Sequence, residues 1–399
     1  MTTDLQGRPF GRQPDLQLNL WQKRQAALID HFASLEYLKG LLERIEALIQ
    51  GADISLDAAM ADGRDRFIAN ARWGTRDTAA NWSTYGYPAL LDWKQTIQRQ
   101  ISLRAVEAYS TTDAQNCAGK LRELSMRWAN EEDEERFNQS FDAVYNYASN
   151  IDRLMKRPQS ANDSVYHTLW HGFESDIASL ETPAYGQKFL RLPRFRIRTD
   201  VVAETSGPPP RTGIYVPQND PYGTLQFAWT GGEWNGSLGK CSTFNKVGQQ
   251  IVSAVGRHNL WSRNPDLLAY VRRHFPEQFE ASIKERQGSR FTLKDLEDPQ
   301  RGDSFLSRNG YAETSCRWYF VEKIEGAWED AAAAEAAAIP PAFRQQRVPA
   351  GEPCPADGYW FTPAQPDSRR RFQRGEVFPQ ITGSDYGDTF WLWAVNQTP

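Results

Sequence analysis

The C-terminal segment 350–399 constrains the fold more than any other stretch, because it is dense in glycine, proline and aromatic residues. Prolines fix the backbone φ angle and glycines permit tight turns, so a regular helix cannot run through this segment. Its bulky aromatic side chains can anchor a small core. They are Tyr359, Trp360, Phe361, Phe390, Trp391 and Trp393. The pattern predicts an ordered β module without a catalytic triad, phosphate loop or set of metal ligands.

The first half of the chain has the periodicity of helices. From Leu20 to Ile49, apolar residues recur at three- and four-residue spacing, which predicts one long helix with an apolar stripe. Gly51 is a suitable residue to end that helix. Further helices are predicted over 56–73, 89–109, 112–155 and 162–180, with a short helix capped by Asp77 or Thr78.

The pattern changes after about residue 183. Basic Arg194, Arg196 and Arg198 alternate with apolar Phe195 and Ile197, which is typical of a strand. More strands are predicted at 212–217, 224–231 and 315–324, and helices at 242–256, 265–274 and 329–341. The fold class is therefore predicted to be α+β, with a helical N-terminal half and a mixed, strand-rich C-terminal half. The predicted domains are a helical domain, 1–183, and an α+β domain, 184–399, that contains the C-terminal β module.

Composition limits the classes of function. The net charge of −4 and the pI of 5.9 argue against nucleic acid as the direct partner. The chain starts without a cationic head followed by an apolar run, and no apolar stretch is long enough to cross a bilayer, so a cytoplasmic protein without a membrane partner is expected. The four cysteines are scattered and form no C-x-x-C pair, which favours reduced thiols, although their even number leaves disulfides open.

Two histidines offer one possible metal site. His167, His171 and Glu174 would share a face of a helix, and two imidazoles with a carboxylate can hold zinc. The zinc-protease pattern H-E-x-x-H is not met, because Thr168 occupies the position of the glutamate. A metal-dependent hydrolase that uses these three residues is therefore the alternative function, while packed or surface histidines remain the simpler interpretation.

A glycine-rich segment ends in Gly239-Lys240 and partly matches a phosphate loop. Trp234 stands where the first glycine of that motif should be, and Cys241 replaces the hydroxyl residue that would hold magnesium. A glycine-rich turn that leads into a helix after Ser242 is the better interpretation. No cofactor is expected.

An acidic run is the candidate partner-binding site. It consists of Glu131, Glu132, Asp133, Glu134 and Glu135. Five consecutive carboxylates cannot all be buried, so they should form an exposed face that can attract a basic partner. A solvated helix face without a partner is the plain alternative. The arginine-rich run 368–374 could contact nucleic acid, but a clamp on the chain's own carboxylates, such as Glu376 or Asp385, fits an acidic chain better.

The tail also carries the pattern of a known group of proteins. The matching positions are Cys354-Pro355, Gly358-Tyr359-Trp360, Pro363, Ser368-Arg369-Arg370, Phe372, Gly375-Glu376, Pro379, Asp385-Tyr386-Gly387, Trp391 and Trp393. With these residues the tail resembles bacterial polymorphic-toxin immunity families seventy-one and seventy-two, which are often encoded beside type VI secretion effectors. The helical half is similar to the domain that accompanies this tail, but amphipathic helices are common and the match there is less specific.

The resemblance implies a function in binding rather than catalysis. It implies a cytoplasmic immunity protein, not an enzyme, that binds and neutralises a cognate toxin effector, a nuclease being the expected class. The matched glycines, prolines and tryptophans are interpreted as residues that determine the fold, so none of them is assigned to the toxin interface. A carbohydrate- or peptide-binding module that uses exposed Trp360 or Trp393 is a third hypothesis.

Overall fold

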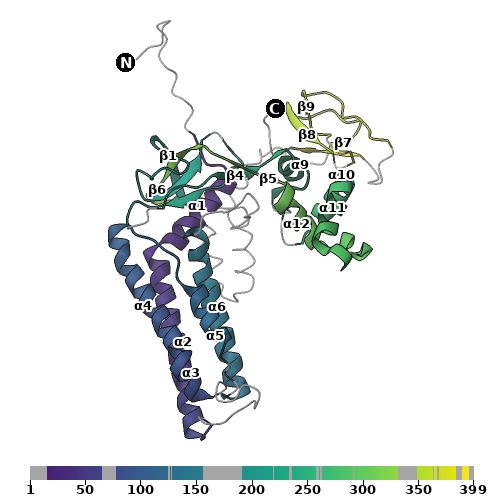
Figure 1. Cartoon of the computed structure of the whole chain (residues 1–399). Helices are drawn as coiled ribbons and strands as arrows, with labels where there is room; N and C mark the ends of the chain where they lie inside the picture. The colour runs from purple at the N-terminus through teal and green to yellow at the C-terminus, as the bar shows by residue number, and fades with distance from the viewer. Residues whose placement is uncertain are drawn as a thin grey trace, which may run out of the picture.

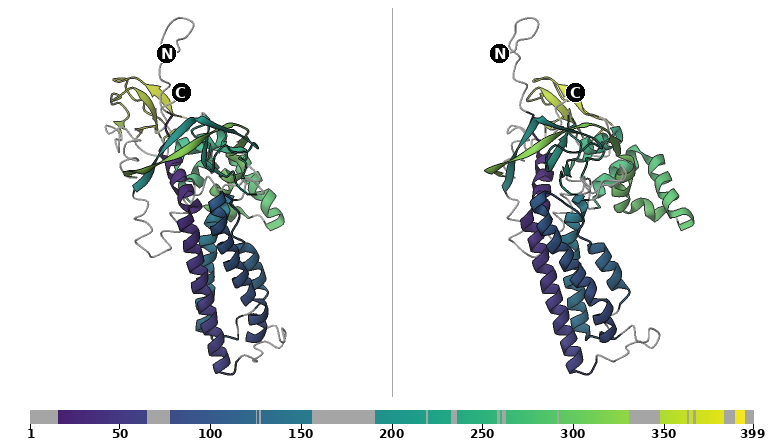
Figure 2. Two further views of the ribbon diagram at one scale, coloured as in Figure 1. Left: turned by 90° about the vertical axis from the view of Figure 1, so that its left-hand side faces the viewer. Right: turned by 60° about the vertical axis from the view of Figure 1, so that its left-hand side comes forward.

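The protein has an α+β fold, in which helices precede a set of antiparallel sheets (Figure 1). In this computed structural model the described residues are 16–64, 78–124, 126, 128–155, 191–218, 220–232, 236–257, 260, 263–290, 292–330, 348–362, 364–365, 368–382 and 389–394. The N-terminal helices are α1 (Leu20–Ala33), α2 (Leu35–Ala61), α3 (Ala79–Tyr85), α4 (Tyr87–Leu103), η2 (Arg104–Val106), α5 (Ala114–Arg122) and α6 (Glu131–Met155). They form an elongated bundle that extends away from the sheets (Figure 2).

The first helix boundary corrects the prediction of a single helix from Leu20 to Ile49. The chain breaks at Ser34, whose extended backbone separates α1 from α2 and whose hydroxyl accepts a 3.1 Å hydrogen bond from the amide of Tyr37. The serine cap gives a hydrogen-bond partner to a backbone amide at the start of the helix that would otherwise be unpaired. The apolar periodicity of the sequence gives no sign of such a cap. The predicted stop at Gly51 is also wrong, since α2 continues to Ala61.

Two other predicted helices begin or divide at asparagine caps. The predicted helix 112–155 is two helices, and Asn130 caps the second by accepting a 2.7 Å hydrogen bond from the amide of Asp133. The predicted helix 242–256 is strand β4 (Cys241–Phe244) followed by α9 (Lys246–Val255), whose cap is Asn245. Thr78 caps α3 as predicted, while the predicted helix 162–180 and the domain boundary near 183 lie outside the described residues.

The first sheet has four antiparallel strands in the order β1–β6–β2–β3. Its strands are β1 (Arg191–Glu204), β2 (Gly213–Pro217), β3 (Gln226–Ala228) and β6 (Arg317–Asp330). The long pair β1–β6 confirms the strands predicted around Phe195 and at 315–324, with β6 extending over residues 329–330, which were predicted to begin a helix. Register shifts within this pair bend the two strands together.

A helical subdomain follows the first three strands. It contains α9, α10 (Pro265–His274), α11 (Pro276–Gln287), η4 (Gly288–Arg290), η5 (Leu293–Glu297) and α12 (Gln300–Asn309), and the ribbon of β4 with β5 (Tyr311–Thr314) joins it to the first sheet. These elements have a hydrophobic core of their own, centred on residues such as Ile251, Val271, Phe279 and Phe305.

The tail forms the β module predicted from its composition. Its sheet has the order β7–β10–β8–β9, built from β7 (Val348–Pro349), β8 (Gly358–Phe361), β9 (Arg370–Phe372) and β10 (Phe390–Trp393). Trp360, Phe372, Phe378 and Trp391 are almost completely buried and contact one another with ring centroids 4.7–5.4 Å apart. Such packing adds to the free energy gained by removing the rings from water.

The bundle and the first sheet share one hydrophobic core. Buried residues of the bundle, such as Leu28 and Ile29 of α1, belong to the same cluster as Ile214, Phe227 and Val321 of the sheet. The bundle is therefore anchored at one end by the sheet. Among the helices that the structure describes, none is both long enough and apolar enough to cross a membrane.

Substitutions at two glycines of α2 test whether this helix is continuous. Gly51→Ala should raise the free energy of unfolding by about 0.5–1 kcal/mol, because a Cβ there would meet no atom within 4 Å and alanine favours a helix interior. Gly40→Ala is the matched control and should instead destabilise, because its Cβ would lie 2.7 Å from the hydroxyl of Tyr147, which stacks on Tyr37 at 3.9 Å. Thermal unfolding followed by circular dichroism measures both, and destabilisation by Gly51→Ala would contradict a continuous α2.

Candidate functional site

The acidic run forms the first turn of α6, at the end of the bundle that lies away from the first sheet (Figure 2). The chain just before it contacts the end of α2, since the Arg64 guanidinium donates a 3.3 Å hydrogen bond to the carbonyl of Trp128. Asn130 then caps the helix. These contacts fix the position of the first turn of α6 and the direction in which the helix continues.

Four of the five acidic residues are at least partly accessible. Glu131, Glu132 and Glu135 are exposed and Glu134 is half-buried. Asp133 differs, because it is buried and its carboxylate accepts a hydrogen bond from Arg136. Three residues of the run are therefore exposed as predicted, Glu134 is exposed only in part, and Asp133 supports the local structure.

The acidic turn lies next to a cluster of packed aromatic side chains. Trp82 of α3 lies 5.6 Å from both Trp128 and Phe137, measured between ring centroids, and both tryptophans are fully buried. Large buried rings leave little freedom for the backbone that they support. The exposed carboxylates therefore project from a fixed platform, and a partner would lose little entropy in ordering it.

Local helix chemistry explains part of this composition. Carboxylates in the first turn interact favourably with the positive end of the helix macrodipole. Arg136 is also close to Glu132, at 4.0 Å, and Gln139 donates a 3.0 Å hydrogen bond to Glu135. Among the described residues, Arg136 is the guanidinium that pairs with this turn of five carboxylates, so an excess of negative charge remains on the described part of this surface.

The other predicted sites have different outcomes. His167, His171 and Glu174 lie outside the described residues. Within the described part of the chain no group of three or more histidine, cysteine or acidic residues is arranged to hold a metal ion.

The glycine-rich segment before β4 is filled by a side chain of the same chain. The amide oxygen of Gln226 accepts a 2.9 Å hydrogen bond from the backbone of Gly239, and its nitrogen donates to the carbonyl of Lys240 at 2.8 Å. Because a phosphate loop needs its backbone amides for the ligand, this arrangement favours a structural turn.

The tail aromatics form a core and offer little binding surface. Trp360 is buried and Trp393 is half-buried, which counts against a binding module built on exposed indoles. The arginine-rich run packs on aromatic faces, with the Arg369 guanidinium carbon 4.1 Å from the centre of the Tyr359 ring. Glu376, predicted as a clamp partner, accepts a hydrogen bond from the backbone amide of Gln373, and Asp385 lies outside the described residues.

The fold brings together two cysteines that are far apart in the sequence. Cys241 in β4 belongs to the hydrophobic cluster against which Cys316, between β5 and β6, is packed, and its thiol donates a 3.6 Å hydrogen bond to the carbonyl of Ser242. The interaction with Cys316, together with burial, raises the pKa of Cys241, and the same interaction lowers the pKa of Cys316. Both cysteines are free thiols, and no motif in the sequence connects them.

Comparisons of this chain with protein-family models, with curated proteins and with solved structures found no match.

The cysteine pair predicts an order of thiol reactivity. Iodoacetamide should label Cys316 first in the native protein, with a rate that rises with pH and levels off below the ordinary thiol pKa, because the thiolate is the reactive form and the pKa of Cys316 is lowered. Cys117 is the internal control, since it is buried and burial raises its pKa to about 12. Peptide mapping by mass spectrometry after timed labelling measures the order. Labelling of Cys241 or Cys117 before Cys316 would contradict the assigned order of thiol pKa values.

Proposed function

We propose that this chain is an immunity protein that binds a cognate toxin effector and neutralises it stoichiometrically. The observation that carries the proposal is the carboxylate cluster of exposed Glu131, Glu132 and Glu135 with half-buried Glu134, held on a fixed aromatic platform at the outer end of the bundle. A dense charge on a rigid support suits recognition of an oppositely charged protein surface.

The expected partner is a basic surface, as found on a nuclease. A protein that grips nucleic acid presents lysine and arginine side chains to the phosphates. Those side chains would attract the carboxylates of α6, which speeds association and selects against acidic partners. A stable inhibitor interface buries about 1,200–2,000 Å² in total, so the acidic turn would be one part of a larger contact surface.

The resemblance of the C-terminal tail to immunity proteins supports the same function. In this proposal the tail module has a structural task, because its matched tryptophans Trp360 and Trp391 are buried. The toxin would be recognised elsewhere on the surface. In this proposal the chain inhibits the toxin by binding to it, so inhibition needs no covalent chemistry.

The direct test is neutralisation of a toxin encoded beside this gene. The full chain should co-purify with that toxin as a stable complex and should restore growth of cells that express it. Size-exclusion chromatography with light scattering measures the stoichiometry, and a growth assay measures rescue. Absence of a complex at micromolar concentrations, together with failed rescue, would refute the proposed function.

Charge reversal tests the acidic surface separately. The triple variant Glu131→Lys, Glu132→Lys and Glu135→Lys should slow association with the toxin about tenfold or more at low ionic strength and weaken its salt dependence. Asp133 is kept because it is buried and bonded to Arg136. Surface plasmon resonance at several salt concentrations measures the association rate.

A matched control reverses three exposed glutamates elsewhere. Glu43, Glu277 and Glu285 are exposed on α2 and α11, and their replacement by lysine changes the net charge by the same amount. This control should retain most of the association rate. Equal slowing in both variants would show that net charge alone matters, and the acidic turn would then not be the contact.

A further inference from the structure

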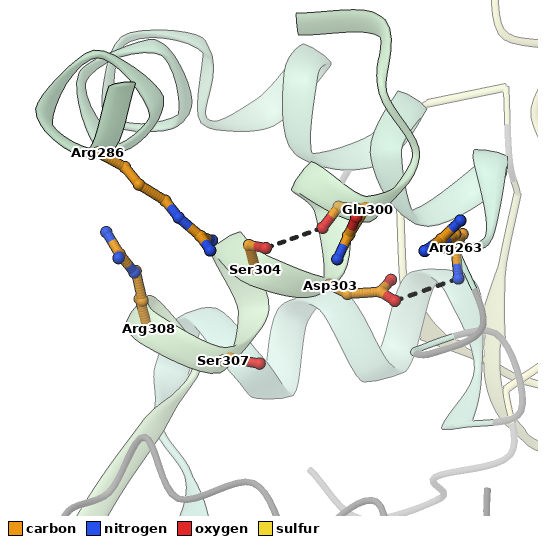
Figure 3. Close-up of a pocket in the computed structure, with 7 residues that line it drawn as sticks. All are labelled: Arg263, Arg286, Gln300, Asp303, Ser304, Ser307 and Arg308. Atoms are coloured by element: carbon orange, nitrogen blue, oxygen red, sulfur yellow. Dashed lines mark hydrogen bonds between the residues drawn. The ribbon is translucent and has the colours of Figure 1, made fainter. Parts of the chain in front are cut away.

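A cleft in the helical subdomain gathers three arginines around one open space (Figure 3). Its volume is about 480 Å³. The lining residues are Arg263, Arg286, Gln300, Asp303, Ser304, Ser307 and Arg308. They come from the segment before α10, from the end of α11 and from one face of α12.

The guanidinium groups enter the cleft from different elements. Figure 3 shows Arg286 of α11 and Arg308 of α12 on one side of the cleft and Arg263 on the other. Arginines near helix ends can be explained by the helix macrodipole alone. Here, however, the side chains of Arg263 and Arg286 form no ion pair with any residue that the structure describes, and all three arginines line the same space. Like charges on both sides of one cleft favour an anion bound within it.

One carboxylate of the cleft has a structural role. The Oδ2 atom of Asp303 accepts a 3.1 Å hydrogen bond from the backbone amide of Arg263, whose own φ angle is +55°. A positive φ is uncommon for a residue with a side chain, and the bond to Asp303 helps to hold it. Asp303 therefore fixes the position of the Arg263 segment, and its single negative charge leaves the lining cationic.

Helix α12 supplies neutral polar side chains from a rigid wall. Gln300, Ser304 and Ser307 follow one another at helical spacing on the face that lines the cleft. Behind them, Arg301 forms ion pairs with Asp295 at 3.0 Å and with Asp298 at 3.6 Å, which hold α12 against η5. The Ser304 hydroxyl donates a 2.9 Å hydrogen bond to the carbonyl of Gln300. The side-chain amide of Gln300 is therefore the neutral group that can donate to an oxyanion beside the arginines.

We propose that this cleft binds a small molecule that carries a phosphate or diphosphate group. Arginine forks bind phosphate oxygens in pairs, and arginines on both sides of the cleft suit a phosphate or diphosphate group better than a single carboxylate. The volume is in the range of small-molecule sites, which leaves room for an organic group of nucleoside size beside the phosphate. The site is independent of the acidic turn of α6, so it does not depend on the proposed function.

Isothermal titration calorimetry of the full chain with pyrophosphate and with ADP, at about 150 mM salt, tests this site. The probes should bind in competition with each other. The double variant Arg286→Gln and Arg308→Gln should weaken both at least tenfold. The double variant Arg272→Gln and Arg290→Gln is the control, because it removes the same charge from exposed arginines outside the cleft and should change binding less than twofold.

Several results would overturn the proposal. One is no binding of either probe at millimolar concentration, and another is equal weakening in the two double variants. Citrate that binds as tightly as pyrophosphate would remove the assignment to phosphate. A short single-stranded oligonucleotide that binds more tightly than ADP, with the same loss in the cleft variant, would replace the small molecule by nucleic acid. None of these measurements requires the toxin, so they leave the proposed function unaffected.

Discussion

The packing of α1 between the bundle and the first sheet determines how the two parts of this protein meet. Most residues of α1 are buried, including the polar Gln25, whose side-chain oxygen accepts a 3.1 Å hydrogen bond from the amide of Leu225 beside β3. At the rim, Lys23 forms a 2.9 Å ion pair with Glu329 of β6. A partly exposed ion pair contributes at most about 1 kcal/mol, so the apolar burial on both sides of α1 is the main source of stability at this junction.

This junction has consequences for both candidate sites. Since the bundle is fixed at its sheet end, its other end, with the acidic turn of α6, extends into solvent (Figure 2). The arginine-lined cleft belongs instead to a subdomain with its own core, connected through the ribbon of β4 and β5. The two surfaces therefore carry opposite charge on separately packed parts of the chain. A basic protein surface and a phosphate-bearing molecule could be bound at the same time.

The errors of the sequence-based prediction have a common physical cause. Apolar periodicity reports which side of a helix is buried, but it does not report where the helix ends. Ser34 caps α2 and Asn130 caps α6 within stretches that were predicted as single helices, and Gly51, a suitable stop, is accommodated inside α2. Asn245 caps α9 after a strand whose residues were predicted to be helical. The acidic turn was recognised because solvation of consecutive carboxylates is a local property. The burial of Asp133 was not predicted, because it depends on the orientation of α6 against its neighbours.

The sequence by itself determined the α+β class, the aromatic β module at the C-terminus and the presence of an exposed acidic cluster, since these follow from local composition and periodicity. Tertiary structure alone decided which distant residues meet. Cys241 and Cys316 become neighbours only when β4 pairs with β5, and Arg263, Arg286 and Arg308 line one cleft only when α11 and α12 pack together. Such contacts join segments of the chain through non-local packing, and no spacing along a single sequence specifies them.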